Sequence, residues 1–188
     1  MVFRVAAIVL MMLAASAAKA DELAEAAGRY RIDPSSVLHF SVAQMGGGGI
    51  AGTFPKFSGI FVLDGGDIAR SKVDFTLDAN AIEAGDPRIG EFIRSDAVFD
   101  AGAYPKITYR STSVTRTGPK TARIDGQLTA RGITRNVGFD VELAGRDQRH
   151  LRFRVTGRMS RALFGMEIGT PIYSNRVEFV LELQGTRI

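Results

Sequence analysis

The chain has 188 residues, of which 24 are Lys or Arg and 20 are Asp or Glu, so its formal charge is +4, and it contains no cysteine. This length predicts a single domain. The absence of cysteine excludes a disulfide framework, a zinc–thiolate site and a thiol nucleophile, and an apolar content of 45% is too high for a disordered chain.

Residues 1–20 have the pattern of a secretory signal peptide. Arg4 precedes an apolar run, and Ala18-Lys19-Ala20 places small residues around the expected cleavage site. The apolar run is shorter than the roughly 20 residues of a membrane-spanning helix. We therefore expect cleavage to give an exported mature domain, residues 21–188, that has no transmembrane anchor. Its charge is +2, because cleavage removes two basic and no acidic residues.

After a polar, alanine-rich leader at residues 21–28, the chain alternates between apolar and polar residues from Tyr30 onward. Six segments show the alternation most clearly: 38–42, 73–77, 107–110, 137–144, 151–156 and 177–184. Successive side chains of a strand point to opposite faces, so each segment has one apolar and one polar face, which is typical of antiparallel sheets. Roughly eight such strands, separated by glycine-containing turns, predict an all-β barrel or sandwich.

One short helix interrupts the strands. Asp86 suits the position that caps a helix, and Pro87 suits the first helical position. Ile89, Phe92 and Ile93 fall on one face of this helix. We expect that face to cover one end of the barrel.

Signals for catalysis and metal binding are weak. The two histidines, His39 and His150, are isolated and predict surface residues rather than metal ligands. Residues 47–52 match a glycine-rich nucleotide motif, but no helix is predicted after them, so we interpret them as a loop between strands. A catalytic triad is neither indicated nor excluded, because it is recognised by geometry. We therefore predict no catalytic residue, no metal and no cofactor.

The charged residues also favour a solvated surface. Asp74 and Asp78 share the polar face of one strand, as do Asp140 and Glu142 of another. Basic residues are scattered and do not form the concentrated face that nucleic acid would require. No nucleic-acid partner is predicted.

The apolar faces carry the functional prediction. In a small barrel they point inward, where they either fill the interior or line a cavity for one ligand, and composition alone does not choose between these outcomes. The candidate ligand-binding residues lie on apolar strand faces and near the helix: Phe40, Phe75, Phe92, Phe99, Tyr109, Phe139, Phe153 and Phe179. A shift of one residue in strand register would turn such side chains outward.

Several segments resemble the YceI-like, polyisoprenoid-binding family of periplasmic proteins. The resemblance covers residues 30–185 and rests on six elements in the same order: Tyr30-Arg31-Ile32-Asp33-Pro34, Gly52-Thr53-Phe54 through Phe57-Ser58-Gly59, Phe92 to Asp100 followed by Tyr104 to Thr108, Leu128 to Arg135, Ser160-Arg161 with Phe164-Gly165-Met166, and Val177-Glu178-Phe179. It implies a single antiparallel, eight-stranded, lipocalin-like barrel that holds a long isoprenoid chain, such as a polyprenyl or quinone tail, and no known enzymatic reaction.

The chain departs from that family at two places. The family often has a histidine near Ser35-Ser36 and another at the position of Gln44, and the loop that follows is unusually rich in glycine here. These differences concern contacts to a head group and leave the apolar lining unchanged. The open alternatives are a filled barrel that binds a partner through residues 46–49 or 146–152, and an enzyme acting on a hydrophobic substrate. A homodimer is compatible with each of them.

Overall fold

The computed structural model describes residues 22–188, and the predicted signal peptide lies outside them. The strands are β1 (Gly28–Ile32), β2 (Val37–Gln44), β3 (Gly49–Thr53), β4 (Phe57–Leu63), β5 (Lys72–Asp78), β6 (Glu83–Ala84), β7 (Lys106–Arg116), β8 (Thr121–Ala130), β9 (Ile133–Arg146), β10 (His150–Ser160) and β11 (Tyr173–Arg187). The helices are α1 (Glu22–Glu25) and α2 (Pro87–Arg94), with 3-10 turns η1 (Ile68–Arg70), η2 (Ala79–Ala81) and η3 (Arg161–Phe164).

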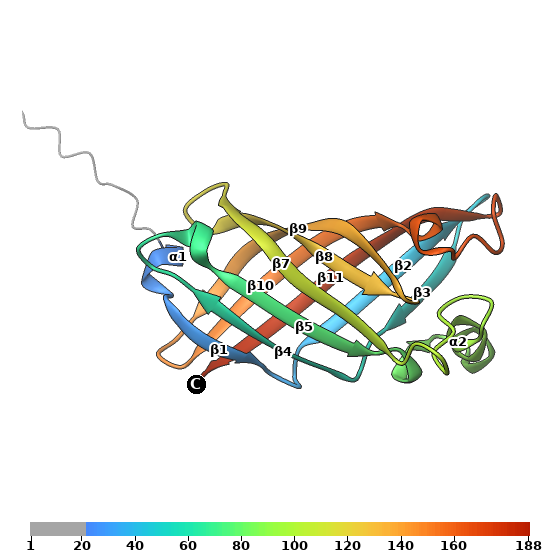
Figure 1. Ribbon diagram of the computed structural model, residues 1–188, viewed down its shortest axis with the longest axis horizontal. Coiled ribbons are helices and arrows are strands. Elements are labelled where there is room, and N and C mark those ends of the chain that lie inside the picture. Colours follow the sequence, from blue (N-terminus) through green and yellow to red (C-terminus); the bar gives the residue numbers. More distant parts are fainter. Residues whose placement is uncertain (1–21) are drawn as a thin grey trace, which may run out of the picture.

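The strands form one antiparallel barrel (Figure 1). Eight of them are hydrogen-bonded in the order β1-β4-β5-β7-β8-β9-β10-β11, and the pairing of β1 with β11 closes the ring. The remaining strands, β2, β3 and β6, continue the sheet from the edge of β11. The predicted eight-stranded antiparallel barrel is therefore confirmed, with three extra strands that lengthen its wall at one end.

The apolar positions of the alternating segments face the inside of this wall, and the polar positions face the outside. On β2, Leu38 and Phe40 are buried while His39 between them is exposed. On β10, Leu151, Phe153 and Val155 are buried, and the arginines between them are exposed. Apolar side chains of one face thus meet in the interior. Removal of their apolar surface from water stabilises the fold by roughly 25 cal/mol for each Å² buried.

The predicted helix is present at one end of the barrel (Figure 1). The Asp86 carboxylate accepts a hydrogen bond from the Arg88 amide at 2.9 Å, and Pro87 occupies the first helical position. Ile93 is buried on the face that the spacing predicted. Helix α1 lies at the opposite end, so that the two helices mark the two ends of the barrel.

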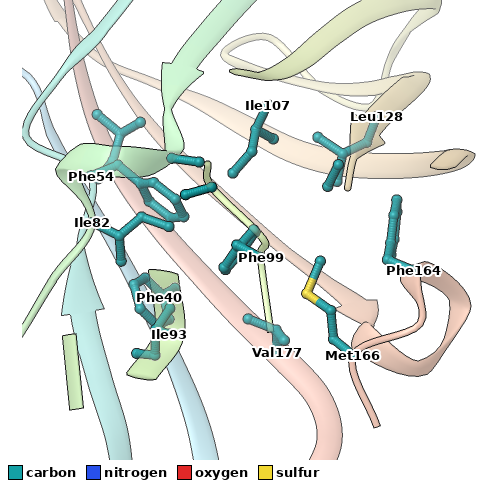
Figure 2. Close-up of a cluster of buried hydrophobic side chains, with 14 of the residues drawn as sticks. Phe40, Phe54, Ile82, Ile93, Phe99, Ile107, Leu128, Phe164, Met166 and Val177 are labelled. Atoms are coloured by element: carbon teal, nitrogen blue, oxygen red, sulfur yellow. The ribbon is translucent and has the colours of Figure 1, made fainter. Parts of the chain in front are cut away.

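Of the glycine-rich segment 47–52, only Gly47 and Gly48 lie in the turn between β2 and β3, while residues 49–52 belong to β3, so the interpretation of the whole segment as a loop is wrong for its second part. No helix follows it, as expected. Buried side chains form two clusters. One lies at the α2 end and includes Phe40, Phe54, Phe99 and Met166. Figure 2 shows its side chains converging from the strands, from α2 and from the segment after η3. The other cluster lies at the α1 end and is built around Leu23, Tyr30, Phe61 and Phe153.

Candidate ligand-binding cavity

A cavity of about 320 Å³ runs through the barrel and touches both buried clusters. Its wall is hydrocarbon almost throughout. The lining side chains with a polar group are Ser71, Tyr109, Arg161 and Tyr173. Such a cavity offers a ligand apolar contact along its whole length, which suits a long hydrocarbon chain.

All eight residues predicted as ligand-binding line this cavity. They come from different parts of the wall: Phe40, Phe75, Phe92, Phe99, Tyr109, Phe139, Phe153 and Phe179. Strand register therefore places each of the strand residues on the inner face. The prediction omitted other lining residues, among them Phe54, Phe61 and Leu23. Phe54 and Phe61 lie in or beside strands whose alternation is weaker, and Leu23 lies in the segment that the sequence presents as a polar leader.

Glycines on neighbouring strands give the inward aromatic rings room to lie along the wall. Phe40 is paired with Gly52, Phe75 with Gly59, and Phe139 with Gly157. A Cβ atom added to Gly157 would come within 2.4 Å of the Phe139 ring, and one added to Gly52 within 2.5 Å of the Phe40 ring.

The Tyr109 ring lies against Gly126, its diagonal neighbour on the adjacent strand, and the Phe61 ring of β4 reaches across β1 to lie against Gly185 of β11. A ring that occupies the space above a glycine extends less far toward the axis of the barrel. The aromatic–glycine pairs therefore help to explain why this interior contains a cavity despite its many aromatic residues.

The two ends of the cavity differ. At the α2 end its lining includes Phe92 and Ile168, whose exposed fractions are 44% and 48%. At the α1 end the lining includes Leu23, which is only 2% exposed, and the half-buried Ile68. The cavity thus reaches the surface beside α2 and is closed beneath α1.

Arg161 is the charged residue of the lining, and its guanidinium stabilises the loop beside the open end. It donates to the carbonyl oxygens of Ser174 at 2.8 Å, Ile168 at 2.8 Å and Tyr173 at 3.1 Å, and also to the Met166 carbonyl and the Thr170 hydroxyl. Burial lowers the pKa of this guanidinium. All five of its N–H groups are occupied by acceptors of the protein itself.

Two further polar groups of the wall, those of Tyr109 and Ser71, are also used by the fold. The Tyr109 hydroxyl donates toward the carbonyl oxygens of Ile124 and Val137, each at 3.3 Å, and burial raises its pKa. The Ser71 hydroxyl accepts from the Asp64 amide at 3.0 Å. Polar side chains therefore do not converge in this cavity in the way that acid–base catalysis would require.

Apart from Arg161, the charged residues singled out in the sequence lie on the outer face of the barrel, as the alternation predicts. Asp74 pairs with Arg110 at 2.8 Å, and Asp140 pairs with Arg123 at 3.1 Å. The His150 ring faces the Asp147 carboxylate at 3.1 Å. Within residues 22–188 no group of three or more His, Asp or Glu side chains is arranged to hold a metal ion. Over the same residues, none of the helices has the length and apolarity to cross a membrane.

Comparison with known proteins assigns the chain to a family. Residues 30–185 match the model of the YceI-like domain, so the chain belongs to the YceI-like family. The UPF0312 protein VPA0850 of Vibrio parahaemolyticus is 33% identical over 131 residues, which cover 68% of this chain and 69% of that protein. Protein YceI of Escherichia coli is 25% identical over 183 residues, which cover 95% and 93% of the two chains.

Solved structures have the same fold. BcnA of Burkholderia cenocepacia superposes with a TM-score of 0.75 at 23% identity, over 81% of this chain and 98% of that one. A polyisoprenoid binding domain from Saccharophagus degradans superposes with a TM-score of 0.69 at 15% identity, over 85% and 98%. The barrel is therefore shared with proteins of low sequence identity.

Proposed function

We propose that this member of the YceI-like family is a periplasmic lipid-binding protein that holds a polyisoprenoid chain, of the polyprenyl or isoprenoid-quinone type, inside its barrel. One observation carries the proposal: the cavity is elongated, is lined by hydrocarbon and reaches the surface at one end. An isoprenoid tail offers only apolar surface, and burial of each CH₂-sized unit is worth about 0.8 kcal/mol. A wall of Phe, Leu, Ile and Val therefore suffices to bind it.

The same residues that were selected from the sequence would contact the chain: Phe40, Phe75, Phe92, Phe99, Tyr109, Phe139, Phe153 and Phe179. The Saccharophagus degradans domain, which is described as polyisoprenoid binding, supports the choice of ligand by analogy of fold. The signal-like residues 1–20 support export to the periplasm.

A binding role is favoured over an enzymatic one by the chemistry of the wall. The hydroxyl and guanidinium groups of Tyr109 and Arg161 are engaged with backbone carbonyls, so they offer no free acid, base or nucleophile. A filled core with function on its loops is disfavoured by the cavity itself. We therefore place carriage or sequestration of the lipid first.

The test is extraction of lipid from the purified mature protein followed by mass spectrometry. We expect an isoprenoid lipid in stoichiometric amount. Two substitutions on one strand provide the contrast, because Leu181 lines the cavity while the adjacent Val180 does not. Leu181→Trp should fill the interior and lower the lipid content several-fold, whereas Val180→Trp should leave it unchanged. Protein that is repeatedly free of lipid, or equal lipid in both variants, would contradict the proposal.

A further inference from the structure

The closed end of the cavity is built by a segment outside the strands. Leu23 of α1 is 2% exposed, lines the cavity, and packs in the cluster that contains Val114, Leu143 and Leu151. Ala26, one turn later, is buried in the same cluster. Helix α1 lies at the end of the barrel opposite α2 (Figure 1). Its Leu23 side chain faces the interior.

Contacts from several turns fix α1 in this position. The Glu22 carboxylate lies 3.2 Å from the Lys120 ammonium of the β7–β8 turn, and Glu25 pairs with Arg146 at the end of β9. A Cβ atom added to Gly65, in the turn after β4, would lie 2.8 Å from both the Ala24 carbonyl oxygen and the Ala27 methyl, so this turn packs directly on α1.

The first strand adds a further contact. The Tyr30 hydroxyl donates to the Ala26 carbonyl at 2.9 Å and accepts from Arg187 at 2.6 Å. Helix α1 is therefore attached to the ends of strands on several sides of the barrel. A segment attached in this way can form a fixed end wall of the cavity, because these contacts must break before it can move aside for a ligand.

We propose that Leu23, presented by α1, is the stop that sets the depth of the cavity and therefore the longest isoprenoid chain that the protein can enclose. This inference rests on the proposed function. A chain that enters tail-first beside Phe92 and Ile168 advances until its end meets Leu23. Isoprene units beyond that length stay in water and add no burial, so affinity stops rising with chain length.

The experiment loads purified, delipidated mature protein from detergent with an equimolar series of polyprenols of increasing length, and native mass spectrometry measures the occupancy of each. For the wild type we expect occupancy to rise with length and then reach a plateau. Leu23→Ala should deepen the cavity and move the plateau toward longer chains by at most about one isoprene unit. Leu23→Phe should move it toward shorter chains.

Leu77→Ala is the matched control, because it removes the same atoms from the side wall near the open end. It should leave the position of the plateau unchanged. Identical length profiles for the wild type and both Leu23 variants would overturn the inference while leaving the proposed function intact. A wild-type protein that takes up no polyprenol of any length would overturn both. Circular dichroism of each variant verifies folding. Because Leu23→Ala and Leu23→Phe are expected to shift the plateau in opposite directions, either variant alone still tests the inference if the other does not fold.

Discussion

The two ends of the barrel are built differently. At the α1 end, apolar side chains close the barrel, and the helix that carries them is attached by two ion pairs and a tyrosine hydroxyl. At the α2 end, arginine side chains bind backbone carbonyls of the loops and leave the cavity open between exposed apolar residues. The closed end therefore combines apolar burial with polar attachment of a helix, whereas the loops at the open end are ordered by hydrogen bonds from arginine to backbone carbonyls.

A second arginine strengthens the polar framework of the α2 end. Arg131 donates to the carbonyl oxygens of Asp96 at 2.9 Å, Val98 at 3.1 Å and Gly165 at 2.9 Å. It therefore joins the loop after α2 to the turn after η3. The planar guanidinium can serve several carbonyls at once, which a lysine ammonium cannot do in the same geometry.

The largest expected effect is at Arg161. Arg161→Ala removes five hydrogen bonds, among them the buried one to the Met166 carbonyl, and a buried carbonyl left without a partner costs about 1–3 kcal/mol. We expect the free energy of unfolding to fall by about 3–5 kcal/mol in urea denaturation, and Arg161→Lys to recover little of it. Arg158→Ala on the exposed face of β10 is the control and should stay within about 0.5 kcal/mol of the wild type. Equal stability of the Arg158 and Arg161 variants would contradict a role for these bonds.

A smaller effect is expected at the α1 end. Tyr30→Phe removes the hydroxyl that binds Ala26 and Arg187 and should cost about 1 kcal/mol. Hydrogen exchange should speed up at the amides of Ala26 and Ala27, which close the last turn of α1. Tyr104→Phe at the exposed α2 end serves as the comparison and should change neither quantity. Faster exchange at both ends in Tyr30→Phe would show that the ends are not independent.

The smallest expected effect is on the stability of the fold at acidic pH, through the Asp86 carboxylate that caps α2. Hydrogen bonds from the side chain and the backbone of Arg88 lower the pKa of Asp86. Because the folded-state pKa lies below the unfolded value, this carboxylate stabilises the fold at pH above the ordinary aspartate range and loses that contribution as the pH falls through the folded-state pKa. Asp86→Asn keeps a capping oxygen but cannot titrate, so its urea midpoint should depend less on pH in that acidic range. The same acid dependence in both proteins would contradict this account.

Much of the fold could be predicted because alternation is a local property. Leu38, Phe40 and Val42, for example, show an inner face before any partner strand is known. The helix signal at Asp86-Pro87 is equally local, and it gave the correct start. The six selected aromatics that lie on strands reached the cavity wall for the same reason.

The hollow interior could not be predicted in the same way. Whether Phe139 fills the lumen or lies along the wall depends on Gly157, which pairs with it only when β9 and β10 meet in one register. Likewise the sequence presents Leu23 as part of a polar leader. Its position in the cavity wall depends on ion pairs of Glu22 and Glu25 with Lys120 and Arg146, which lie about a hundred residues away in the chain. Such long-range pairings determine both the width and the depth of the cavity.

Strand β11 has a consequence for how the barrel assembles. One edge of this fifteen-residue strand pairs with β10, and the other pairs with β2 and then with β1, about 150 residues earlier in the chain. The ring cannot be completed until this strand is available to join both neighbours. Contacts so distant in sequence slow folding, because a long loop must be ordered before any bond is gained. The seam of the barrel therefore joins β1 to β11, and closure depends on synthesis having passed Arg187.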